Sequence, residues 1–144
     1  MDTYLELHEI PVLRVKADMK GAGPPAAFHA LESALPTLKG RKFYGCFQVK
    51  AEGEDYYACV ERIETDDPET MRLDTGVIPG GWYVRRKLWE WESKIAQFPE
   101  LFNEMTKAAD VDPSRPSLEF YRSQSELQLL VPVRGPPTKE THAA

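Results

Sequence analysis

Hydrophobic positions along the chain follow two periods, and the order of these periods occurs twice. Residues 4–16 alternate at the two-residue period of a strand, and four apolar residues share one side: Leu5, Leu7, Leu13 and Val15. Pro11 interrupts this strand, which predicts an edge position or a bulge. After the break at Gly21–Pro25, helical spacing appears in Phe28, Leu31, Leu35 and Leu38. Pro36 is expected to end that helix early, and Gly40 to close it.

Two strands are predicted after this helix. Lys42–Lys50 alternates, and after a polar turn Tyr56–Ile63 forms its hairpin partner. The polar segment Glu64–Thr70 contains a proline and is the best candidate for a linker.

The second part of the chain repeats the order. Residues 71–88 are extended, and Pro79-Gly80-Gly81 marks a bulge or a corner between two short strands. Residues 90–109 form the clearest helix, with Pro99 as its kink. Ser117–Ser123 and Glu126–Arg134 form the last hairpin. The tail at residues 135–144 is polar, rich in proline and expected to be flexible.

The repeated order predicts an α+β fold in one domain spanning residues 1–144. Two pseudo-symmetric βαββ units, at about residues 2–65 and 67–134, pair into a curved antiparallel sheet with the helices on one side. A ligand cleft is expected between the halves, where small-molecule sites tend to lie. Phe43-Tyr44 and Phe120-Tyr121 open equivalent strands of the two units.

Composition narrows the partners. The net charge of −5 makes nucleic acid and anionic membranes poor partners and mildly favours cationic ligands. Cys46 and Cys59 lie in predicted strands without metal-ligand spacing, so they are interpreted as reduced core thiols, and no metal or other cofactor is expected. The sequence has no apolar stretch of membrane-spanning length and no signal peptide, which indicates a cytoplasmic protein.

Glu119 is the residue most suggestive of chemistry, because it lies within an apolar, aromatic strand. Leu118 and Phe120 point to the face opposite Glu119 and Tyr121. If the former pair packs under the helices, the latter pair faces the cleft. A carboxylate there must be paired, hydrogen-bonded or protonated, because burying an unpaired charge is costly. A lipophilic cation would supply the missing charge; the alternative is a salt bridge on a solvated face to Arg62, Arg85 or Arg122.

Three segments of the second half together resemble the GyrI-like small-molecule-binding domains, in a stand-alone form without a DNA-binding segment. Val77-Ile78-Pro79-Gly80-Gly81-Trp82-Tyr83 is similar to that family's Pro-x-Gly-x-Tyr corner. Pro116-Ser117-Leu118-Glu119-Phe120-Tyr121 is similar to its Pro-x-x-Glu-x-Tyr strand, and Leu130-Val131-Pro132-Val133 to its closing strand. The first half matches only through its order of elements.

The resemblance implies an aromatic pocket between the halves with Glu119 as its acidic residue. Tyr121 would face the pocket, Tyr44 would line the other wall, and one of Trp82 and Tyr83 would reach it. Tyr57 and Glu61 share a side of their strand, which would bring a second carboxylate to the rim; the alternative for Glu61 is a solvated pair with Arg62 or Lys50. Trp91 is interpreted as core packing at a helix start.

Three functions remain open. The first is a binding protein for flat, lipophilic and cationic compounds of the multidrug type. The second, implied by hydrolases in the family, is the opening of a strained, cyclopropane-bearing cytotoxin, with Glu119 as general base and Tyr121 beside it. The third is a protein-interaction module that inhibits a cytoplasmic enzyme. An enclosed aromatic pocket would favour the first two, and an acidic patch on one face the third.

Overall fold

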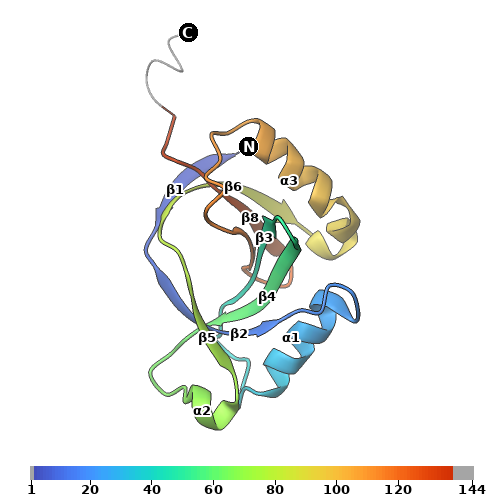
Figure 1. Cartoon of the computed structure of the whole chain (residues 1–144), viewed down its shortest axis with the longest axis vertical. Helices are drawn as coiled ribbons and strands as arrows, with labels where there is room; N and C mark the ends of the chain where they lie inside the picture. Colours follow the sequence, from blue (N-terminus) through green and yellow to red (C-terminus); the bar gives the residue numbers. More distant parts are fainter. Residues whose placement is uncertain (1, 138–144) are drawn as a thin grey trace.

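The computed structural model describes residues 2–137, which form one curled antiparallel sheet with helices on one face (Figure 1). The strands are β1 (Thr3–Leu7), β2 (Ile10–Lys16), β3 (Phe43–Lys50), β4 (Gly53–Glu61), β5 (Asp74–Ile78), β6 (Gly81–Trp89), β7 (Ser117–Tyr121) and β8 (Glu126–Pro132). The helices are α1 (Gly23–Ser33), α2 (Pro68–Met71), the 3-10 helix η1 (Trp91–Gln97) and α3 (Phe98–Lys107). The predicted α+β class is therefore confirmed.

The strand order is symmetric about the central pair of β7 and β3. It runs β1-β6-β8-β7-β3-β4-β2-β5, so each half places its first strand outside its hairpin. One half contains β2, α1, β3 and β4, and the other contains β6, α3, β7 and β8. This is the predicted order of elements, whereas superposition of the halves at residues 2–65 and 67–134 stays a prediction.

Both long helices cover the same face of the sheet, one over each half. From α1, Leu31 packs with Leu13 and Val60, and from α3, Phe102 packs with Leu127 and Leu129. The β7 and β3 strands are the central pair of the sheet, between the half that α3 covers and the half that α1 covers. Two cavities lie on this face, and both are lined by residues of the two central strands.

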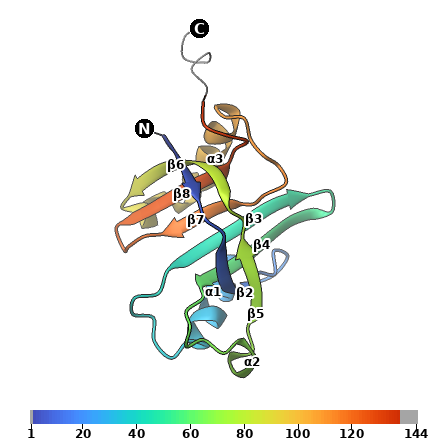
Figure 2. The same cartoon turned by 90° about the vertical axis from the view of Figure 1, so that its left-hand side faces the viewer.

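The opposite face forms the interior of the curl. The pairing of β1 with β6 continues into that of β2 with β5, because Leu7 faces Gly81 and Ile10 faces Ile78 at the same register. Figure 2 shows these two long, bent strands side by side. Behind them a second core holds eight buried residues: Val12, Tyr44, Cys46, Cys59, Ile78, Tyr83, Leu118 and Leu130.

The corners explain where the predicted alternation was wrong. Leu5 and Leu7 pack in the interior, whereas Leu13 and Val15 pack under α1, because the chain bends at His8 and Glu9 between the two strands. The four residues, which were expected on one side of a single strand, therefore lie on two different faces of the sheet. Pro79 and Gly80 form the matching corner between β5 and β6, as one of the two predicted alternatives had it.

The helix predictions hold with adjusted ends. The first helix ends at Ser33, before Pro36, and Leu38 is exposed. Pro99 does not kink a long helix; it lies in the first turn of α3, where a missing N–H is tolerated, and the preceding turns are η1. The predicted linker overlaps α2, and residues 138–144 of the predicted tail lie outside the described residues. None of the helices described is long and apolar enough to cross a membrane.

The two corners of the chain, at His8-Glu9 and Pro79-Gly80, lie close together, so we predict that a side chain at Gly80 would clash. A Cβ there would lie 2.9 Å from the Glu9 nitrogen and 3.1 Å from the Leu7 oxygen, both backbone atoms. We expect Gly80→Ala to lower the free energy of unfolding by ~1–3 kcal/mol in a denaturant titration. Gly135→Ala is the control, since a Cβ there meets nothing within 4 Å. Equal stabilities of the two variants would contradict the tight corner.

Candidate ligand-binding site

The site lies on the helix-covered face, where three neighbouring strands place a carboxylate beside two small residues. Glu119 of β7 pairs with Gly45 of β3, and Gly45 pairs with Ala58 of β4. Because Gly45 has no side chain and that of Ala58 is a single methyl group, little projects from the sheet surface beside Glu119. Tyr56 lies two residues before Ala58 on the same face, so its ring extends across Gly45 toward Glu119.

Two phenols hold one oxygen of Glu119. The Tyr56 hydroxyl donates to Oε1 at 2.5 Å, and the Tyr121 hydroxyl donates to the same atom at 3.0 Å. A Cβ at Gly45 would collide with both the Tyr56 hydroxyl and Glu119 Oε1, so only glycine allows this contact. Oε2 accepts no hydrogen bond from the described residues, yet it is not fully buried. It is therefore the oxygen available to the adjacent cavity.

Glu119 is buried without a cationic partner. Only 9% of the residue is exposed, and among residues 2–137 it forms no salt bridge. Burial raises the pKa of Glu119 above its ordinary value, while the hydrogen bonds from Tyr56 and Tyr121 act in the opposite direction. The pKa values of both phenols are raised by burial and by the nearby carboxylate, which keeps them protonated as donors. The alternative of a solvated salt bridge to Arg62, Arg85 or Arg122 is therefore wrong.

Aromatic side chains form the walls of this region, which we call the helix groove. A cavity of about 350 Å³ beside Glu119 is lined by Tyr56, Phe47, Phe98 and Phe102, with Met19 and Val49 at exposed positions. A second cavity of about 460 Å³ is lined by Phe28, Phe43, Trp91 and Tyr121. The Tyr121 ring packs edge-on against Phe28 at 5.3 Å and Trp91 at 5.2 Å between ring centroids. Phe28 of α1 and Trp91 of η1 thus both pack against Tyr121 of the central strand β7.

The structure brings together only part of the residue set predicted for the pocket. Glu119 and Tyr121 line the helix groove, so they lie on the face of the sheet that carries the helices. Leu118 and Phe120 lie on the opposite face, in the interior core. The expectation that Leu118 and Phe120 pack under the helices was therefore wrong. The cleft still faces Glu119, because α1 and α3 cover the two halves and leave the centre open.

The other predicted residues lie apart from Glu119. Tyr44, Tyr57 and Tyr83 belong to the interior core, since alternation turns them away from the helices. Burial raises the pKa of Tyr44 to about 12, and Tyr83 donates to the Pro79 oxygen at 2.6 Å. Trp82 packs beside the core under α3, and neither Trp82 nor Tyr83 lines a cavity of the described groove. Glu61 lies 4.0 Å from Lys42 Nζ, so its solvated pairing is with Lys42, not Arg62 or Lys50.

Sequence reasoning missed Tyr56, Gly45 and Phe28 as site residues. It assigned Trp91 to core packing, and Trp91 packs against the core under α3 as well as lining the groove. A strand alternation that places Tyr57 on one face places Tyr56 on the other, which was the available signal. The importance of Gly45 becomes visible only when β7 and β4 are known to flank β3.

The fold resembles solved structures at low sequence identity. An integron cassette protein from Vibrio cholerae matches with a TM-score of 0.71 and 16% identity, over 92% of this chain and 95% of that one. The protein SAV2435, bound to tetraphenylphosphonium, matches with a TM-score of 0.67 and 13% identity, over 94% of both chains. A hydrolase from Listeria innocua matches with a TM-score of 0.57 and 12% identity, over 91% of this chain and 90% of that one.

No protein-family model and no curated protein sequence matches the chain. At identities of 12–16%, structural likeness establishes the fold alone. The chain has the GyrI-like fold that these structures share, in agreement with the three strand motifs of its second half.

Proposed function

We propose that this protein binds lipophilic cations with aromatic groups in the helix groove. The observation that carries the proposal is Glu119: a buried carboxylate, held by two phenols, with one oxygen open to an aromatic cavity and no cation beside it among the described residues. An uncompensated buried charge is unfavourable, and a cationic ligand is the partner that would compensate it.

The groove has the two features that such a ligand needs. Its aromatic rings offer cation–π contacts, each worth about 0.5–2 kcal/mol. Its carboxylate is already fixed in position by Tyr56 and Tyr121, so little ordering of Glu119 is needed on binding. The two cavities together suit a ligand with several aromatic groups, since both are lined by rings and they meet around Tyr121 and Glu119.

The comparisons support this choice of ligand class. SAV2435, which has the same fold, was solved with tetraphenylphosphonium, a lipophilic cation. The low identity means that the ligand of SAV2435 does not transfer by likeness alone. The proposal for this chain therefore depends on its own carboxylate and rings.

Hydrolysis of a strained electrophile is a second candidate. Its specific support is the raised pKa of Glu119 together with a free Oε2 facing the cavity, which suits a general base. Glu119 would take a proton from water, the resulting hydroxyl would bond to a ring carbon, and the strained bond would break, with the released carbon taking up a proton. The aromatic cavities favour both pocket-based functions over an inhibitory interaction module, and no metal or other cofactor is invoked for either.

Removing the charge of Glu119 should affect charged and neutral ligands differently. We expect Glu119→Gln to weaken tetraphenylphosphonium binding by about tenfold or more, because removing one partner of a buried ion pair costs ~3–5 kcal/mol. Binding of the neutral triphenylphosphine oxide should change little. Isothermal titration calorimetry measures both.

The matched control is Glu54→Gln, which removes an exposed carboxylate from the rim of the same cavity. Its effect should stay within about twofold, because water screens exposed charges. Equal losses for the cation and the neutral ligand in Glu119→Gln would indicate a structural role for Glu119 and would contradict the proposal.

Cation binding should also depend on pH through Glu119. Binding requires the carboxylate, so it strengthens as pH rises through the Glu119 pKa. Tyr56→Phe removes a hydrogen bond to the charged form, so the pKa of Glu119 rises and the midpoint of binding should move to higher pH. Tyr57→Phe, the next residue on the same strand but on the interior face, should leave the midpoint in place. A midpoint unmoved by Tyr56→Phe would exclude this role of the phenol.

Turnover separates the second candidate from the first. If the protein hydrolyses a cyclopropane-bearing electrophile, Glu119→Gln should reduce the rate ~10²–10⁴-fold while affinity for the neutral substrate stays nearly intact. Mass spectrometry of the incubated compound measures product. If compounds bind but are recovered unchanged, the hydrolase function is excluded and only the binding function remains.

A further inference from the structure

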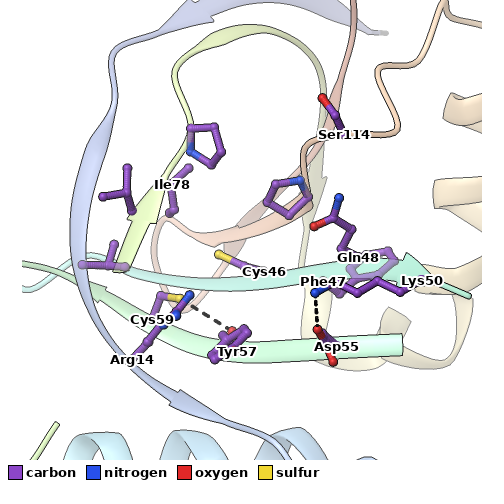
Figure 3. A pocket seen from close by; sticks show the side chains of 14 residues that line it. Arg14, Cys46, Phe47, Gln48, Lys50, Asp55, Tyr57, Cys59, Ile78 and Ser114 are labelled. Atoms are coloured by element: carbon purple, nitrogen blue, oxygen red, sulfur yellow. Dashed lines mark hydrogen bonds and ion pairs between the residues drawn. The ribbon is translucent and has the colours of Figure 1, made fainter. Parts of the chain in front are cut away.

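The interior of the curled sheet contains a third cavity, apart from the two cavities of the helix groove. It has a volume of about 310 Å³ and lies on the face of β2, β3 and β4 opposite Glu119. Figure 3 looks into it: Ile78 and Ser114 lie on one side of the space, and Arg14, Tyr57 and Asp55 on the other. The function proposed above makes no use of this cavity.

Arg14 is the main polar group of this interior cavity, and it is held in one orientation. Its guanidinium lies 4.1 Å from the centroid of the Tyr57 ring. On β5, a Cβ at Gly76 would lie 2.8 Å from three guanidinium atoms, so the missing side chain makes room for Arg14. Nε donates to Asp74 Oδ2 at 2.8 Å. The planar group is thus fixed on its face and at one edge.

The remaining edge of the guanidinium is free. Neither η nitrogen of Arg14 donates a hydrogen bond within the described residues, and neither is fully buried. A guanidinium edge of this kind matches the two oxygens of a carboxylate. Asp74 neutralises Arg14 only in part, because its side chain is 60% exposed and screened by water.

The other charges in the interior cavity compensate each other. Lys50 Nζ lies 2.8 Å from Asp55 Oδ2, so this pair adds no net charge at the mouth. Arg14 is the remaining charged side chain in the described lining. The wall opposite the guanidinium is apolar, with Val77, Ile78 and Pro79. The volume is near the lower end of the range for ligand pockets, which indicates a small ligand.

We propose that this interior cavity is a second binding site, for small planar organic carboxylates such as aromatic acids. The carboxylate accepts from the free edge of Arg14, and the flat apolar body lies between Tyr57 and the wall formed by Ile78. The ligand preference is opposite in charge to that of the helix groove. A single sheet would therefore bind a cation on its helix face and an anion in its interior.

The test uses benzoate as the probe and benzamide as its neutral counterpart. We expect benzoate to bind the unaltered protein at least about tenfold more tightly than benzamide, because the charge-assisted pair with Arg14 is lost with the amide. In a two-dimensional NMR titration, the amide signals of Cys46, Tyr57 and Ile78 should shift, and those of Phe28 and Trp91 should not. No shifts, equal binding of the two probes, or shifts confined to the helix groove would overturn the proposal.

Two variants locate the charge that matters. Arg14→Gln should weaken benzoate binding about tenfold or more. Lys87→Gln removes the same charge from an exposed side chain of β6, outside the described lining of the cavity, and should change affinity by less than about twofold. Circular dichroism tests whether both variants fold. If Arg14→Gln does not fold, the NMR titration of the unaltered protein still tests whether benzoate binds in the interior cavity. Equal effects of the two variants would show that benzoate responds only to net charge.

Discussion

The site depends on one constraint: a carboxylate must remain buried with only neutral donors around it. Glu119 is nine-tenths buried, and two phenols share one of its oxygens. Hydrogen bonds from tyrosine favour the charged form but do not neutralise it. The free protein therefore retains an uncompensated buried charge, and under the proposed function a cationic ligand would compensate it. Without this buried charge, an aromatic groove would bind charged and neutral aromatic molecules with similar affinity.

The rest of the fold holds this arrangement in place. The phenol of Tyr56 reaches Glu119 only because Gly45, on the strand between them, has no side chain. The two helices pack on separate halves of the sheet, so the central strands remain accessible from above. The continuous pairing of β1–β2 with β5–β6 closes the other face around a core of its own. Each side of β3 thus faces a different cavity.

The sequence predicted the order of elements, the single sheet and the unusual position of Glu119 within an aromatic strand. Periodicity sufficed there, because helices and strands differ in period. Periodicity cannot tell which face of a strand the helices cover, so Leu118 and Phe120 were assigned to the wrong side. It also cannot see a corner such as His8-Glu9, where the alternation changes face. The interior positions of Tyr44, Tyr57 and Tyr83 follow from these two facts.

Residues that act across strands were the hardest to predict. Tyr56 and Gly45 matter because of β-sheet neighbours that lie 63 and 74 residues away from them in the chain. A glycine in a strand does signal a close approach, but its partner is known only from the register. Phe28 and Trp91 come from helical segments whose distance from β7 depends on how the halves pack together.

The most direct test of the central claim is the pKa of Glu119 itself, measured by the ¹³C chemical shift of its carboxyl carbon across a pH titration. We expect the pKa of Glu119 to lie above the ordinary glutamate range in the free protein, because burial outweighs the two hydrogen bonds. We further expect that pKa to fall when tetraphenylphosphonium saturates the groove, since a nearby cation favours the carboxylate. An ordinary pKa that the cation leaves unchanged would rule out Glu119 as the buried partner of a cationic ligand.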